Sequence, residues 1–324
     1  MLLASAGTAA RVETVPCTGP LGGRRRARLG WIGPRVAVVE MAEACGLRLL
    51  PRGALDPMGA TSRGAGEMVV AALAGGAERI IVGVGGSAST DGGSGILVAL
   101  GARLLDDRGR PVSAGGRGLS RIAAIDLSGV DRRLQGCRVD VAVDVRSPLC
   151  GPDGAAHVFA PQKGADHRQV VALDAALQHL AVLLERATDR PGLAQRPGAG
   201  AAGGAAFALA ALGADLVAGA ALVADETGLD AALAGASVVI TGEGRLDVQT
   251  LAGKAPAEVA ERARQAGVPC VAVCGTVAGG EGLFAATVAL DRLGRDPRRH
   301  ARALLRIAAR CAVAVVRDGG LVQP

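Results

Sequence analysis

Short runs of β-branched residues that end in glycine and lead into Ala/Leu-rich segments of helical spacing recur along this chain of 324 residues. The clearest is RIIVGVGGSASTDGGSGILVALGARLL, in which the pattern predicts a buried strand at 80–84, a loop at 85–93 and a helix at 94–105. A second such unit is SVVITGEGRLDVQTLAGKAPAEVAERARQAG, which the strand PCVAVCG follows. Because successive strand–helix units pair in parallel, the pattern predicts an α/β protein with a parallel sheet.

The flanking segments add further elements. Residues 138–145 are predicted to form another strand, and residues 170–187 and 297–317 are predicted to form helices. The Pro/Gly/Ala-rich stretch 196–212 has helical spacing in its second half, which predicts a glycine loop that leads into a helix. In residues 11–47, turn residues separate short strand-like runs, and this predicts antiparallel pairing in a second, mixed α/β domain.

Composition excludes some classes of function. Half of the residues are apolar, so the chain can bury a large core, and its net charge of +6 comes from arginines spread along the whole sequence. Nucleic-acid binders combine positive charge with aromatic platforms or a recognisable module, but Phe and Trp total four here and Tyr is absent. We therefore expect small-molecule substrates and no nucleic-acid partner.

The cysteines and the apolar runs bear on location. The seven cysteines form no CxxC motif and no Cys/His cluster, which argues against zinc and against a disulfide framework and fits a reducing cytoplasm. The apolar runs are too interrupted for a membrane span, and the first residues lack the pattern of a signal peptide. We expect a cytoplasmic protein without a membrane partner, and a homo-oligomer is left open.

Three glycine-rich segments, 83–93, 197–204 and 241–247, are candidates for binding phosphate. Glycine lets backbone N–H groups approach an anion, and the N-terminus of a following helix favours negative charge. None matches GxxxxGK[ST], and in a chain with 49 glycines a plain tight turn is the competing interpretation of each. The candidate phosphate- or substrate-binding residues in these segments are Gly85, Gly86, Ser87, Asp91, Gly92, Gly200, Gly242, Glu243, Gly244 and Arg245.

Lysine is rare in this chain, which makes its positions informative. Of the 36 basic residues only Lys163 and Lys254 are lysines. A compositional drift toward arginine should leave lysine where a planar guanidinium is a poor substitute for a compact ammonium. Lys254 precedes a predicted helix, where the helix dipole disfavours a cation, so we expect a bound anion or a carboxylate beside it. Retention by chance is the alternative for either lysine.

Acidic residues follow the predicted strands, at the sheet edge where ligands of open α/β proteins collect. Capping or turn formation explains any one of them alone. With the two lysines and Arg245 they suggest phosphoryl transfer, in which carboxylates bind Mg²⁺ or accept a hydroxyl proton and cations neutralise the moving group. We predict that Asp144, Asp247 and Lys254 are catalytic, that Asp144 and Asp247 are the metal ligands and face one cleft, and that Lys163 binds phosphate or substrate.

Five segments, in the order GGSASTDGG, DVRSPLCG, FAPQKGA, PGAGAAGG and ITGEGRLDVQTLAGKAP, resemble the signature segments of the type I glycerate kinase family. The similarity extends from about residue 12 to residue 276. It implies ATP-dependent phosphorylation of a hydroxyl group of D-glycerate with Mg²⁺. It also implies a flavodoxin-like, Rossmann-like parallel-sheet domain, expected at 66–125 and 235–324, and a second mixed α/β domain, expected at 12–65 and 126–234.

The chain departs from the family pattern in two ways. Ser89, Thr90 and Ser147 replace residues of the family segments GGSATNDGG and DVxNPLxG, and asparagine is absent from the whole chain. The family's PDSFKGS-like and ADGGEGT-like segments have no counterpart here, and we expect the in-frame DNA before Met1 to encode them. Two other interpretations stay open: an impaired relic or interaction subunit that keeps the fold and, ranked last, a nicotinamide-dependent oxidoreductase.

Overall fold

The computed structural model describes residues 10–51, 53–247, 250, 254–293, 303, 305–307 and 310. The chain forms two compact units, Met1–Gly219 and Ala220–Pro324, and each is described by itself. Among the described residues, no helix is both long and apolar enough to cross a lipid bilayer.

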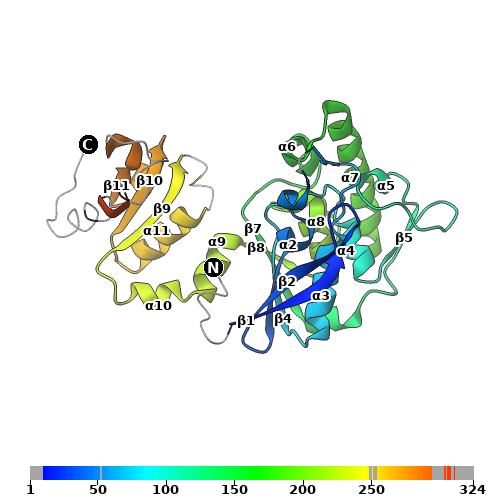
Figure 1. Ribbon diagram of the computed structural model, residues 1–324, viewed down its shortest axis with the longest axis horizontal. Coiled ribbons are helices and arrows are strands. Elements are labelled where there is room, and N and C mark those ends of the chain that lie inside the picture. Colours follow the sequence, from blue (N-terminus) through cyan, green and yellow to red (C-terminus); the bar gives the residue numbers. More distant parts are fainter. Residues whose placement is uncertain are drawn as a thin grey trace. The chain divides into compact units, whose positions relative to one another are not determined.

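The first unit is built on a mixed sheet of six strands in the order β1-β2-β3-β4-β7-β8 (Figure 1). Strand β2 pairs antiparallel with β1 and with β3, as the turn residues predict. The pairs β3–β4, β4–β7 and β7–β8 are parallel. The strands are β1 (Ala10–Thr18), β2 (Arg24–Ile32), β3 (Val36–Glu40), β4 (Arg79–Gly83), β7 (Arg138–Val143) and β8 (Asp215–Ala218). A separate antiparallel pair joins β5 (Arg103–Leu105) to β6 (Ala124–Asp126).

Two apolar clusters form the core of this unit. One gathers around Trp31, Met68 and Ile80, and the other around Leu173 and Phe207. The helix α8 contributes side chains to both clusters, so it links the two parts of the core. The helices of the unit are α2 (Met41–Cys45), α3 (Arg63–Ala74), α4 (Ser94–Ala99), α5 (Gly116–Leu119), α6 (Ala155–Phe159), α7 (His167–Thr188) and α8 (Ala201–Ala211).

The second unit contains a parallel sheet of three strands in the order β11-β10-β9. Figure 1 shows α11 lying along β9 and β10, and the small core of the unit includes Ala260 and Ala263 of that helix. The strands are β9 (Val239–Leu246), β10 (Cys270–Val277) and β11 (Ala286–Ala289), and the helices are α9 (Gly219–Glu226), α10 (Leu229–Leu233) and α11 (Ala255–Gln265).

The units differ from the interleaved domains expected from the sequence. Strand β4, which we expected in the Rossmann-like domain, pairs with β3 on one side and with β7 on the other. Residues 66–125 therefore share one sheet and one unit with the segments before and after them. The mixed α/β class and the parallel strands are as expected.

Two local expectations were wrong. The helix expected at 94–105 ends at Ala99, because Gly101 adopts a left-handed backbone with φ +104 and the chain then enters β5. The glycine loop expected at 241–247 is strand as far as Leu246. The helix expected at 297–317 lies largely outside the described residues, although residues 303, 305–307 and 310 are helical.

The glycines of β9 allow close approach of β10. A Cβ atom added to Gly242 would lie 2.0 Å from the carbonyl oxygen of Val273, whereas one added to Gly244 would meet nothing within 4 Å. Gly242 is therefore explained by strand packing, without reference to a ligand.

We expect Gly242→Ala to destabilise the second unit by at least about 2 kcal/mol, because the added methyl group forces β9 and β10 apart. Gly244→Ala is the matched control on the same strand and should be neutral or slightly stabilising. Hydrogen exchange of the β9 and β10 amides measures the difference locally. Equal protection in the two variants would contradict the packing role of Gly242.

Candidate functional site

A cavity of about 400 Å³ in the first unit lies at the carboxyl ends of the parallel strands β4 and β7. This is the edge at which open α/β sheets bind ligands. The cavity is lined by Leu47, Val84, Gly85, Gly86, Ser87, Ala142, Asp144, Val145, Phe159, Gln162, Lys163, Ala201 and Ala202. It therefore brings together five residues predicted from the sequence: Gly85, Gly86, Ser87, Asp144 and Lys163.

Lys163 ends the short 3₁₀ turn Pro161–Lys163 and is only 3% exposed. Its Nζ donates hydrogen bonds to the hydroxyl of Ser87 at 3.1 Å and to the main-chain carbonyl of Ser89 at 2.5 Å. Both acceptors are neutral, and burial lowers the pKa of Lys163 to about 8, although the negative charge of Asp91 opposes this fall. Among the described residues, no carboxylate is hydrogen-bonded to this buried ammonium, so it is suited to bind an anion.

Asp91 is fully buried and holds the loop rather than lining the cavity. Its carboxylate accepts hydrogen bonds from the backbone N–H and the hydroxyl of Ser62, both at 2.8 Å, and from the backbone N–H groups of Gly93 and Gly95. These donors give Asp91 a structural role, and its contact with a ligand stays a prediction. Ser62 was not predicted, because no motif connects it to Asp91.

Two glycine segments pack against each other beside the cavity. The backbone N–H of Gly92 donates to the carbonyl of Gly203 at 2.8 Å, and a Cβ atom on Gly203 would lie 2.2 Å from the carbonyl oxygen of Ser89. A Cβ atom on Gly92 would lie 2.3 Å from Leu180, and one on Gly200 would lie 2.2 Å from the carbonyl oxygen of Pro148. Close packing therefore explains why positions 92 and 200 are glycine, and the contact of Gly92 and Gly200 with a ligand stays a prediction.

Two of the three departures from the family pattern, Ser89 and Thr90, fall in packed positions, whereas Ser147 is partly exposed. Ser89 and Thr90 are fully buried, and among the described atoms their hydroxyl groups have no hydrogen-bond partner. Neither residue lines the cavity. These two substitutions therefore act on the packing of the loop that supports Lys163.

Asp144 directly follows β7 and lines the cavity as an exposed carboxylate. Gly219, the last residue of the first unit, leaves room for it, because a Cβ atom there would lie 2.6 Å from Oδ1 of Asp144. Asp144 belongs to the first unit and Asp247 to the second. That the two carboxylates face one cleft therefore stays a prediction.

The lowered pKa of Lys163 predicts a pH dependence of stability. Between pH 8 and 10.5 the unfolded lysine keeps a proton that the folded lysine has lost, so the free energy of unfolding should rise with pH in this window. Relative to Lys163→Met, the wild type should gain roughly 3 kcal/mol across the window. Urea denaturation of both proteins at several pH values measures this. The cysteine thiols titrate alike in both, and parallel stability curves would contradict the prediction.

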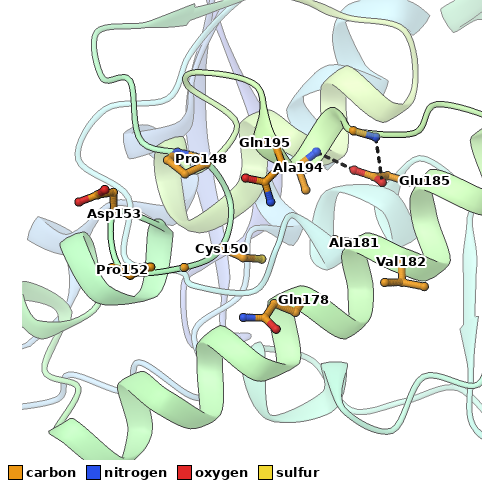
Figure 2. Close-up of a pocket in the computed structure, with 12 residues that line it drawn as sticks. Pro148, Cys150, Pro152, Asp153, Gln178, Ala181, Val182, Glu185, Ala194 and Gln195 are labelled. Atoms are coloured by element: carbon orange, nitrogen blue, oxygen red, sulfur yellow. Dashed lines mark hydrogen bonds between the residues drawn. The ribbon is translucent and has the colours of Figure 1, made fainter.

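A larger cavity, of about 590 Å³, lies elsewhere in the first unit, between α7 and the loop at 148–153 (Figure 2). Figure 2 shows Glu185 accepting two hydrogen bonds, from the backbone N–H groups of Gly192 and Ala194. Of the described residues that line this cavity, Asp153 and Glu185 are acidic and none is lysine, arginine or histidine. Its chemistry does not suit a phosphate or a carboxylate, despite its size.

The second unit contains the other group of predicted residues. At the end of β9, the side chain of Thr250 donates a hydrogen bond of 2.5 Å to Glu243, and the Nζ atom of Lys254 lies 3.9 Å from the same carboxylate. Glu243 is thus the carboxylate expected beside Lys254. The Nε atom of Arg245 lies 3.4 Å from Oδ2 of Asp247. Thr250 was not predicted, although its place between Asp247 and Lys254 in the motif could have indicated it.

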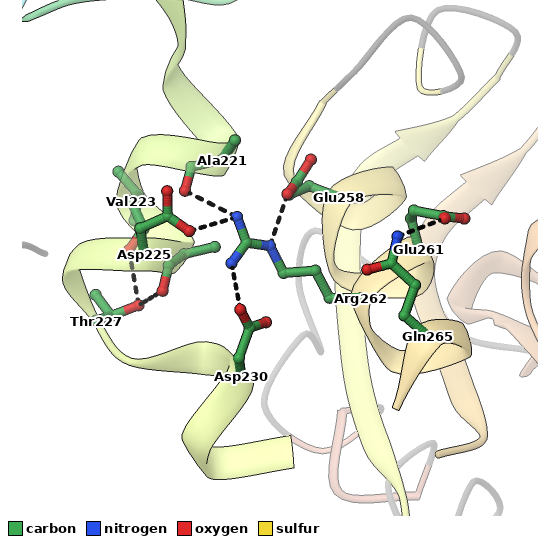
Figure 3. Close-up of polar contacts among 10 residues, drawn as sticks. Ala221, Val223, Asp225, Thr227, Asp230, Glu258, Glu261, Arg262 and Gln265 are labelled. Atoms are coloured by element: carbon green, nitrogen blue, oxygen red, sulfur yellow. Dashed lines mark hydrogen bonds and ion pairs between the residues drawn. The ribbon is translucent and has the colours of Figure 1, made fainter. Parts of the chain in front are cut away.

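Arg262 contacts three carboxylates, more than Arg245 or Lys254 does among the described residues, and its role is structural. Figure 3 shows its guanidinium between Asp225, Asp230 and Glu258. Nitrogen atoms of the guanidinium lie 2.6, 3.0 and 2.7 Å from these carboxylates, in the same order. The hydrogen bond to Glu258 is the main cause that raises the pKa of Arg262 above its ordinary value. Its donors hold α9, α10 and α11 together, which is a structural role.

The described residues contain no group of three or more His, Cys, Asp or Glu side chains that could hold a metal ion. Mg²⁺ is commonly held by one or two carboxylates together with phosphate oxygens and water, so it does not need such a group. Two aspartates are compatible with this mode of binding. One is Asp247, which lies beside Arg245, and the other is the exposed Asp144.

Comparisons with known proteins agree on one family. The model described as "Glycerate kinase family" matches residues 1–300. Glycerate kinase of Bacillus subtilis (strain 168) is 45% identical over 272 residues, which are 83% of this chain and 71% of that protein. Glycerate 2-kinase of Escherichia coli (strain K12) is 43% identical over 262 residues, which are 80% of this chain and 68% of that protein.

The fold is similar to a solved structure as well. A crystal structure of a candidate glycerate kinase 2 from Salmonella typhimurium LT2 superposes with a TM-score of 0.84 at 42% sequence identity. The superposition covers 98% of this chain and 85% of that one.

Proposed function

This chain belongs to the glycerate kinase family, and on that premise we propose that it transfers the γ-phosphoryl group of ATP to a hydroxyl group of D-glycerate. The observation that carries the proposal is the cavity at the ends of β4 and β7, which combines a buried ammonium, Lys163, with an exposed carboxylate, Asp144. The first can hold an anionic substrate, and the second can accept a proton.

In the proposed reaction, a hydroxyl oxygen of glycerate forms a bond to the γ-phosphorus of ATP. The bond from that phosphorus to the oxygen that bridges it to the β-phosphate breaks, and ADP leaves with the electron pair. The hydroxyl proton passes to the carboxylate of Asp144. The products are phosphoglycerate and ADP.

We assign the cations of the second unit to the nucleotide phosphates. Lys254 and Arg245 neutralise negative charge that develops during transfer, and Glu243 and Thr250 orient Lys254. Of the two carboxylates expected to bind Mg²⁺, we keep Asp247 for this role, together with phosphate oxygens. When bound there, Mg²⁺ would supply further positive charge against the phosphates.

We also propose a cytoplasmic location. Six cysteines, Cys17, Cys45, Cys137, Cys150, Cys270 and Cys274, are buried free thiols. Burial raises the pKa of Cys45 and of Cys150 to about 12, so both remain protonated and unreactive at neutral pH. Free thiols used as small apolar residues are typical of a reducing compartment.

The direct test is a coupled assay for ADP release with D-glycerate, ATP and Mg²⁺. We expect Asp144→Asn to lower kcat at least about 100-fold, because the amide cannot accept the hydroxyl proton. Asp153→Asn, which changes another exposed aspartate of the same unit, should retain the wild-type kcat. Binding of D-glycerate without formation of product by the wild type would instead favour the impaired relic.

A further inference from the structure

We propose that the cavity beside Lys163 binds the hydroxy acid, with its carboxylate on Lys163 and Ser87, and that the nucleotide phosphates bind outside this cavity. The inference rests on the proposed function and deepens it, because it assigns one of the two substrates to one cavity of the first unit.

Charge balance favours the acid over the nucleotide. Of the described residues that line the cavity, Lys163 is the one cation and Asp144 the one acid. A single ammonium neutralises a single carboxylate, whereas a triphosphate carries several negative charges and requires several cations or a metal ion. A triphosphate in this cavity would leave most of its charge uncompensated next to Asp144.

The hydrogen-bonding capacity at Lys163 also matches one carboxylate. An ammonium has three donors, and the Nζ atom of Lys163 uses two of them for Ser87 and for the carbonyl of Ser89. The third can reach one oxygen of a bound carboxylate. Ser87 accepts from Lys163, so its own O–H is available to donate to the second carboxylate oxygen.

Asp144 sets the direction in which the acid lies. Its negative charge repels the substrate carboxylate and so favours binding with that group turned toward Lys163. The hydroxyl groups of a three-carbon acid then lie on the side of Asp144, where a carboxylate accepts their hydrogen bonds. Lys163 thus acts in recognition of the acid, while Asp144 meets the reacting end.

Separate binding measurements for the two substrates test this assignment. Isothermal titration calorimetry of the full chain, with D-glycerate and with a non-hydrolysable ATP analogue in Mg²⁺, gives a dissociation constant for each. For Lys163→Met we expect the constant for D-glycerate to rise about 30-fold, the loss expected for a charge-assisted hydrogen bond. The constant for the ATP analogue should stay within about twofold.

Ser87→Ala provides a second variant that keeps the ammonium and the fold, and we expect it to raise the constant for D-glycerate about tenfold. Gln195→Ala, an exposed residue at the cavity of Figure 2, should change neither constant. The KM values for the two substrates should follow the same pattern.

Two results would overturn the inference, and they are distinguishable. If Lys163→Met weakens binding of the ATP analogue and leaves D-glycerate unaffected, the cavity binds the nucleotide and the proposed function stands. If the wild type neither binds nor phosphorylates D-glycerate, the proposed function fails and the inference fails with it.

Discussion

The site depends on the contact between two glycine segments, residues 89–93 and 200–204. The main-chain carbonyl of Ser89, in the first segment, has two neighbours. Gly203 of the second segment packs against it, and Lys163 donates a hydrogen bond to it. This packing requires three consecutive left-handed residues, Ala202 among them at φ +54. A left-handed alanine costs about 1–2 kcal/mol, which the surrounding packing has to offset. The strained residues thus lie beside the cavity and pack against the loop that accepts a hydrogen bond from Lys163.

The sequence predicted the residue types of the site better than their roles. Lys163 and Lys254 could be found because lysine is rare in this chain, and Asp144 because it follows a strand. The roles of the glycines could not be found in this way. Gly86 and Gly92 occur in one motif and both have positive φ, but Gly86 lines the cavity whereas Gly92 packs against Leu180. The difference is set by side chains far away in the sequence, and no local pattern records it.

The same limit explains the division of the chain. Strand periodicity is local, and it correctly predicted β4 and β7 to within about two residues. Which strands become neighbours depends on pairs such as Val38 with Ile81, which are distant in sequence. The resemblance implied a separate domain for β4, whereas β4 joins the sheet that begins with an antiparallel hairpin. Gly101 likewise ended a helix that its apolar spacing had extended into β5.

The structure gives different reasons why the two lysines are not arginine. At Lys163 one nitrogen atom bonds both Ser87 and the Ser89 carbonyl in a buried position, a geometry that a wide, planar guanidinium cannot reproduce. Among the residues that the structure describes, none encloses Lys254 in this way, and its side chain is 40% exposed beside Glu243. An arginine at this position would also carry a positive charge to pair with Glu243. We therefore attribute the lysine at position 254 to its proposed contact with the phosphoryl group, and retention by chance is the alternative.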